Sequence, residues 1–156
     1  RKETQASSAT PKNTRKTETV SSSAVPASAS DIKEVDGISW SWPAQGKVIA
    51  AFAAGKNRGI DIAGTRGQKV LSAADGTVLH KGSMNGYGNL VIIKHSDNVL
   101  SAYAHNDKIL VKEKQQIRRG QQIAEMGSTD SDRVKLHFEI RYQGKPVDPV
   151  KYLPAQ

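Results

Sequence analysis

Residues 134–142 decide the fold, and they read Val134-Lys135-Leu136-His137-Phe138-Glu139-Ile140-Arg141-Tyr142. Apolar and polar residues alternate along this stretch without a break. Because successive side chains of a strand point to opposite faces of a sheet, the pattern predicts a β-strand with one buried and one polar face. The polar face carries Lys135, His137, Glu139 and Arg141. Its plain interpretation is the solvated side of a sheet.

Short aliphatic runs extend the same fold class to the rest of the domain. Residues 47–50, 76–79 and 89–93 read KVIA, GTVL and NLVII, and turn-forming glycine and aspartate lie between such runs. Residues 89–94 and 100–105 are expected to form the arms of a hairpin, and no long segment has helical periodicity. We predict an all-β fold with little helix, a single small antiparallel β-sandwich.

The composition changes near residue 38. Residues 1–37 contain 12 Ser or Thr and no aromatic residue, so they cannot bury enough apolar surface to offset their ordering entropy. We expect a flexible linker over 1–37 and one domain over 38–156, whose 119 residues suffice for a core. The linker has 6 basic and 5 acidic residues and the domain 17 and 10, so the domain holds +7 of the net charge of +8.

Composition also excludes several classes of protein. No apolar run approaches the roughly 20 residues that a membrane-spanning helix needs. The absence of cysteine excludes disulfides, thiol nucleophiles and thiolate metal sites. A pI near 9.8 suggests nucleic-acid binding, but aromatic residues are only 5% and no stacking platform is evident, so no nucleic-acid partner is expected. The chain begins at Arg1 without a signal-peptide pattern, which suggests a processed or truncated product.

Four motifs accompany the alternating strand in a fixed order. They are Gly59-Ile60-Asp61-Ile62-Ala63, Ala73-Ala74-Asp75-Gly76, Tyr103-Ala104-His105 and Leu136-His137-Phe138-Glu139. From about Trp42 to Leu153 the chain resembles the LytM-type, lysostaphin-like zinc endopeptidases, which cut peptidoglycan cross-links. Each fragment alone is weak, but four in register carry the resemblance.

The resemblance implies a zinc site that this sequence does not complete. In the family, zinc is held by a His four residues before an Asp, by that Asp, and by the second His of a His-x-His strand. Asp61 and His137 match two of these ligands, and His105 matches a histidine that assists the metal-bound water. Asn57 stands at the first ligand position, and Lys135 stands at the first position of the His-x-His pair.

These two departures predict a site without catalysis. A catalytic zinc needs three protein ligands and an open position, whereas an amide oxygen is a poor ligand and an ammonium group repels a divalent cation. His80 and His95 are expected at strand ends, away from any metal. We therefore expect no cofactor and no catalytic residue. A weak metal site on Asp61, His137 and His105 is the alternative.

Family members that lack the zinc ligands activate other cell-wall hydrolases. The chain is most similar to murein hydrolase activators of the NlpD, EnvC and ActS kind, and above all to the NlpD type. The resemblance implies an N-acetylmuramoyl-L-alanine amidase and peptidoglycan as partners, and a periplasmic location tethered to the outer membrane through an upstream lipid anchor. The amidase's regulatory segment would bind a groove formed by Asn57, Arg58, Asp61, Tyr87, His105, Lys135, His137, Glu139 and Arg141.

Other interpretations stay open from sequence. The domain could be a zinc endopeptidase with a variant ligand set, or a passive peptidoglycan-binding module attracted by its charge. Arg141 could simply pair with Glu139, Tyr87 could only cover a turn, and Asp61 could bond to backbone. His105 and His137 could form a hydrogen-bonded pair. The apolar residues before the domain could pack across the cleft or form an edge strand: Ile32, Val35, Ile38 and Trp40.

Overall fold

The computed structural model describes residues 34–35 and 37–155 of the chain. Every regular element in this part is a β-strand except one 3-10 turn, and all strand pairs are antiparallel. The elements are β1 (Glu34–Val35), β2 (Ile38–Ser39), β3 (Val48–Ala50), β4 (Ile60–Ala63), β5 (Lys69–Leu71), β6 (Gly76–Met84), β7 (Gly88–Lys94), β8 (Val99–Ile109), β9 (Gln116–Ile117), β10 (Gln122–Met126), β11 (Lys135–Tyr142), β12 (Lys145–Val147) and η2 (Pro149–Lys151). The predicted all-β class is confirmed.

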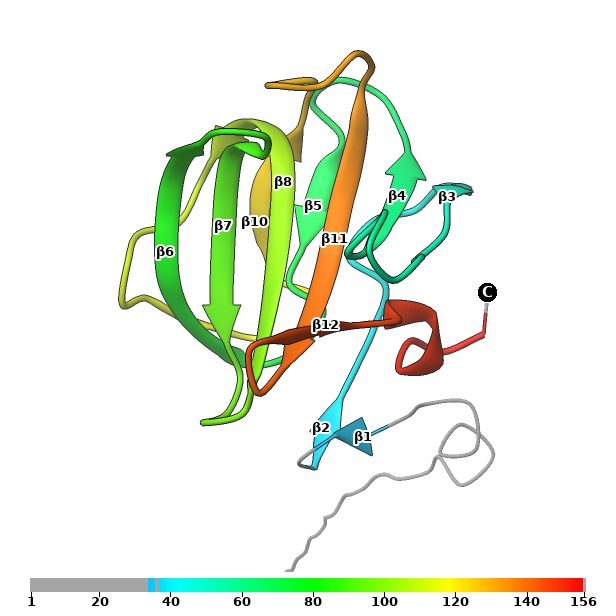
Figure 1. Ribbon diagram of the computed structural model, residues 1–156. Helices are drawn as coiled ribbons and strands as arrows, with labels where there is room; N and C mark the ends of the chain where they lie inside the picture. Colours follow the sequence, from blue (N-terminus) through cyan, green and yellow to red (C-terminus); the bar gives the residue numbers. More distant parts are fainter. Residues whose placement is uncertain (1–33, 36, 156) are drawn as a thin grey trace, which may run out of the picture.

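One ten-stranded sheet forms both layers of the sandwich. Its main path runs β3-β4-β11-β8-β7-β6-β9, while β10 pairs with β5 and with the far end of β8. Strand β8 pairs with β11 up to Ala104 and with β10 from Asn106 onward. Figure 1 shows β5 and β10 behind the layer of β6, β7, β8 and β11. The change of partner along β8 therefore folds the sheet over on itself.

His105 lies where β8 changes partner. Its φ is +68°, a left-handed conformation that is uncommon outside glycine but several-fold enriched in His, Asn and Asp. The β7–β8 pairing shifts register at the same place, between Asn89 and Val91. A kink here lets β8 leave β11 and continue into the second layer.

The alternating strand is β11, and its two predicted faces are present. On the core side, Leu136 and Phe138 are fully buried, and Val134 and Tyr142 pack against the core at its margin. The predicted hairpin is also confirmed, since β7 and β8 pair from Lys94 opposite Leu100 to Asn89 opposite Asn106. The polar side chains of β11 are left on the other face of the sheet, where the site lies.

Two alternatives were open for the apolar residues before the domain, and Val35 and Ile38 pair as strands in the two-stranded sheet β1–β2. The other alternative, packing across the cleft, is wrong for Trp40, and the position predicted for His80 is wrong as well. Trp40 is 1% exposed and lies in the core, with its ring centroid 5.0 Å from that of His95, so it does not cross the cleft. Complete burial of this large apolar side chain stabilises the fold more than a position at the rim of the cleft would. Ile32 falls outside the described residues. His80 lies inside β6 rather than at its end, at a register shift in the pairing with β7.

The part of the chain that the structure describes contains no helix of the length and hydropathy needed to cross a membrane.

Candidate functional site

A cleft of about 510 Å³ opens on the face of the sheet formed by β4 and β11. Eight of the nine residues predicted for the groove line it, namely Asn57, Arg58, Asp61, Tyr87, His105, Lys135, His137 and Glu139. Arg141 is not a lining residue but contacts two that are, Tyr87 and Glu139. The sequence-predicted residues are thus brought together in space.

Strand register places the charged side chains of the cleft. In the β4–β11 pair, His137 lies opposite Asp61 and Lys135 opposite Ala63. Alternate residues of β11 then project onto one face. The loop before β4 lies close over this floor at Gly59, where an added Cβ would meet the Phe138 carbonyl oxygen at 2.1 Å. Only glycine permits this close approach, which brings Asn57 and Arg58 to the rim.

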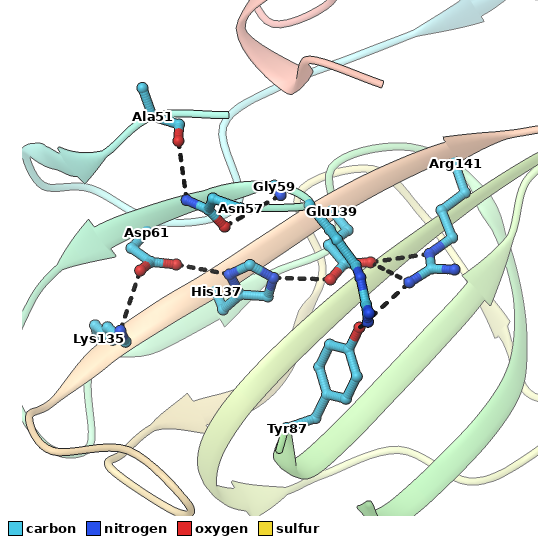
Figure 2. Close-up of polar contacts among 10 residues, drawn as sticks. Ala51, Asn57, Gly59, Asp61, Tyr87, Lys135, His137, Glu139 and Arg141 are labelled. Carbon is cyan, nitrogen blue, oxygen red and sulfur yellow. Dashed lines mark hydrogen bonds and ion pairs between the residues drawn. The ribbon is translucent and has the colours of Figure 1, made fainter. Parts of the chain in front are cut away.

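Five side chains form a continuous row of alternating charge, which we call the charge ladder: Lys135, Asp61, His137, Glu139 and Arg141. Lys135 Nζ lies 3.0 Å from Asp61 Oδ2, and His137 Nδ1 lies 2.6 Å from Asp61 Oδ1. His137 Nε2 lies 2.8 Å from Glu139 Oε2. Arg141 Nε donates to Glu139 Oε1 at 2.9 Å, and a terminal nitrogen of Arg141 forms an ion pair with the same oxygen at 2.7 Å. Figure 2 shows this row along β11.

The contacts of the ladder shift the pKa of His137 and of the two carboxylates. Burial lowers the pKa of His137, but its bonds to Asp61 and Glu139 outweigh burial and raise that pKa to about 9. Burial raises the pKa of Glu139, yet the bonds from His137 and Arg141 prevail and lower it to about 2. Burial also raises the pKa of Asp61, but the bonds from His137 and Lys135 prevail, and this pKa lies below its ordinary value. At neutral pH His137 is therefore a cation that donates from both ring nitrogens.

Tyr87, from the turn between β6 and β7, contacts the arginine end of the ladder. Its hydroxyl oxygen accepts from a terminal nitrogen of Arg58 at 3.0 Å and from one of Arg141 at 3.3 Å, and its ring centroid lies 6.0 Å from that of His137. The turn that carries it is tied down, since Gly86 N–H donates to Asp130 Oδ2 at 2.6 Å. Tyr87 therefore joins two arginines at the cleft and does more than cover a turn.

His105 is the one histidine of the cleft outside the ladder. Burial lowers its pKa, and its Nδ1 lies 2.8 Å from the Thr129 carbonyl oxygen. A bond to a carbonyl requires Nδ1 to carry the proton, which leaves Nε2 as an acceptor in the neutral ring. Its ring centroid is 6.1 Å from that of His137. The two histidines are thus separate, and the interpretation as a hydrogen-bonded pair is wrong.

The donor atoms of the cleft do not match a zinc site. Both carboxylate oxygens of Asp61 face cations, and both nitrogens of His137 face carboxylates. The Asn57 side chain turns to its own loop, donating to the Ala51 carbonyl at 2.9 Å and accepting from Gly59 N–H at 3.4 Å. Over residues 37–155, no group of three or more His, Cys, Asp or Glu side chains is placed to hold a metal ion.

Sequence reasoning missed part of the cleft wall. Lys56, Asn85 and Pro146 also line it. Lys56 adjoins Asn57 in the sequence and was within reach of the motif. Asn85 lies in the turn after β6 and Pro146 in β12, outside all the motifs, so neither carries a sequence signal. Thr129, which bonds to His105, was missed for the same reason.

Comparison with known proteins defines the class. Residues 55–149 match peptidase family M23, and the chain belongs to that family. It is similar to a zinc-containing peptidase from Vibrio cholerae, with a TM-score of 0.68 and 30% identity over 71% of this chain and 39% of that one.

Relatives of known sequence narrow the comparison within the family. Over 120 residues the chain is 57% identical to the murein hydrolase activator NlpD of Escherichia coli, covering 75% of this chain and 32% of that protein. It is 61% identical over 120 residues to the lipoprotein NlpD/LppB homolog of Pseudomonas aeruginosa, covering 75% and 40%. The chain thus spans well under half the length of these curated relatives.

Proposed function

We propose that this chain is a non-catalytic activator of periplasmic N-acetylmuramoyl-L-alanine amidases and promotes peptidoglycan cleavage at cell division. The observation that carries the proposal is the pair of cations, Lys135 and protonated His137, on the two oxygens of Asp61. A catalytic zinc requires three protein ligands and an open position for water. In this chain the positive charge beside Asp61 comes from the side chains of Lys135 and His137. The name of the Escherichia coli relative, murein hydrolase activator, supports the same conclusion.

The former substrate cleft acts as a docking groove for the amidase's regulatory segment. Its floor is the charge ladder, and Tyr87 with Arg58 and Arg141 supplies an aromatic anchor beside two guanidinium groups. Tyr and Arg are, with Trp, the side chains enriched at the energetic hot spots of protein interfaces. Shifting an inhibited amidase from 1:99 to 99:1 needs about 5.5 kcal/mol of differential binding, which one docked segment can supply.

The location belongs to the same proposal. The relative from Pseudomonas aeruginosa is named a lipoprotein, which supports a periplasmic domain held to the outer membrane by an anchor elsewhere in the protein. Peptidoglycan is then within reach as the polymer on which the activated amidase acts.

Dye release from labelled peptidoglycan tests the function. The three samples are this chain alone, a periplasmic amidase alone, and the mixture. We expect strong release only from the mixture. Release by the chain alone that a chelator abolishes would overturn the proposal and favour the zinc endopeptidase.

A matched set of variants tests the loss of the metal site. The double variant Asn57→His with Lys135→His places histidine at both positions where the chain departs from the family pattern. We expect it to retain stoichiometric zinc after dialysis. Asn57→His alone should retain none, because the Lys135 ammonium group still lies 3.0 Å from Asp61 Oδ2 and repels a divalent cation. Metal content is read by elemental analysis. Stoichiometric zinc in the unaltered chain would contradict this account.

A further inference from the structure

A second hollow, of about 570 Å³, lies outside the cleft, where residues 37–39, Asp75 before β6 and His95 after β7 meet the segment after β9. A third, of about 560 Å³, adjoins it and shares Asp75, His95 and Arg118 with it. Lys94 lines one of the two, and Arg119 lines the other. Nothing in the proposed amidase contact uses this region.

Residues 118–121, which we call the arginine turn, have a rigid backbone. Arg119 N–H donates to Asp75 Oδ1 at 2.7 Å, and Gly120 N–H donates to the carbonyl of the fully buried Ser72 at 2.8 Å. Within the turn, Arg118 N–H donates to Gln121 Oε1 at 3.0 Å, and Gln121 N–H donates back to the Arg118 carbonyl at 3.0 Å. The turn is thus fixed to the core.

The side chains of the same turn are uncommitted. Arg118 and Arg119 are exposed, and neither guanidinium has a hydrogen-bond or ion-pair partner among residues 37–155. Lys94, by contrast, already lies 3.6 Å from Asp97. A fixed backbone that carries two adjacent unpaired arginines presents ten N–H donors to one ligand without the cost of ordering a loop.

The charge of these hollows suits an anion. Their charged lining residues are Lys94, Arg118, Arg119 and Asp75, three cations against one carboxylate. Asp75 directs one oxygen to the Arg119 N–H and so helps hold the turn. Burial lowers the pKa of His95 to about 4, so this ring is neutral and adds no charge at physiological pH. Arginine forks bind carboxylates with two parallel hydrogen bonds.

The hollows lie at the opposite end of the β6–β7 hairpin from the cleft. Tyr87 sits in the turn that joins the two strands, whereas Thr77 and Lys94 pair at their other ends. Met84 lies seven residues after Thr77, and at about 3.3 Å per residue this is roughly 23 Å. Figure 1 shows the joining turn and the open ends of β6 and β7 at opposite ends of the sheet. A ligand at one end leaves the other end free.

We propose that the arginine turn is a second binding site, which takes carboxylate groups of peptidoglycan through Arg118 and Arg119. The inference rests on the proposed function, since it places the wall polymer at one end of the domain and the amidase segment at the other. The domain would then hold its amidase against the wall while the cleft stays open to the regulatory segment.

Pelleting of the chain with purified sacculi at low ionic strength tests this site. The variant is Arg118→Gln with Arg119→Gln, which removes two charges and no described side-chain contact. The matched control is Lys47→Gln with Lys151→Gln, which removes two exposed charges that line neither hollow. Sacculi whose carboxylates have been amidated form the second arm, and a melting curve of each variant verifies folding.

We expect the arginine variant to bind sacculi at least fivefold more weakly than the unaltered chain, and the lysine variant to stay within twofold. Amidated sacculi should bind the unaltered chain as weakly as the arginine variant binds untreated ones. Equal losses in both variants would mean attraction by net charge alone and overturn the site, as would no pelleting of the unaltered chain. No amidase is present, so these outcomes are independent of the dye-release result.

Discussion

Strand β11 has two faces, and each contains a side chain that is 0% exposed, Phe138 toward the core and Glu139 toward the cleft. Phe138 is stabilised by apolar surroundings, including the ring of Tyr103 at 5.2 Å. Glu139 is stabilised by two cations, Arg141 and His137. Apolar burial is non-directional, whereas a buried charge costs several kcal/mol unless its partners stay in place. The two faces therefore differ in what a single substitution does to them.

The largest expected effect is on the core face. Phe138→Ala leaves a cavity and should lower the free energy of unfolding by about 4 kcal/mol. Denaturant unfolding followed by tryptophan fluorescence measures it. A loss below about 1 kcal/mol would mean that the core collapses into the space, and that the core face is not closely packed.

The next largest effect is expected from a substitution on the cleft face. Glu139→Gln keeps the shape of the side chain but removes the only carboxylate that Arg141 contacts among the described residues and one of the two that His137 contacts, so the free energy of unfolding should fall by about 3 kcal/mol. The matched control is Glu113→Gln, an exposed carboxylate that should change stability by less than about 0.5 kcal/mol. Equal small changes in both variants would show that the ladder does not stabilise the fold.

A pH series separates the two faces, because the cleft face carries the groups whose pKa values the fold shifts, His137 and Glu139. The pKa of His137 is raised from 6.5 to about 9, so its contribution is full below pH 6.5 and is lost as the pH rises toward 9. The pKa of Glu139 is lowered from 4.5 to about 2, so its contribution is full above pH 4.5 and is lost as the pH falls toward 2.

The ladder is therefore most stabilising between pH 4.5 and 6.5. We expect stability to fall by on the order of 2 kcal/mol from this window to above pH 9, counting the shared His137–Glu139 pair once. Chemical denaturation at each pH measures the fall, and His137→Gln serves as the control. An equally steep fall in that variant would assign the effect to other groups.

The smallest effect on stability is expected at the end of the ladder. Tyr87→Phe removes the hydroxyl that accepts from Arg58 and Arg141 and should cost no more than about 1 kcal/mol. Amidase activation in the dye-release assay should nevertheless fall at least fivefold, because the two arginines lose their common partner. Full activation by this variant, with Arg141→Ala equally active, would remove the cleft from the proposed function.

Sequence patterns predicted this fold where they were local. Period-two alternation identified β11 and its buried Leu136 and Phe138, and the spacing of aliphatic runs identified the β7–β8 hairpin. The pattern failed at His80, because the register shift inside β6 depends on the pairing with β7. It failed at Trp40, because burial of this ring beside His95 depends on a contact between residues far apart in the sequence. Motif resemblance identified the cleft residues, although it left their contacts open.

By itself the sequence determined the strand faces, the charged residues of the cleft, and the two departures at Asn57 and Lys135. Only the tertiary structure decided how those charges pair. Asp61 and His137 are 76 residues apart, and only the antiparallel register of β4 and β11 brings them to 2.6 Å. The arginine turn likewise became visible only when folding fixed its backbone on Ser72 and Asp75. Side-chain type is local, but pairing and pKa depend on distances that the whole fold sets.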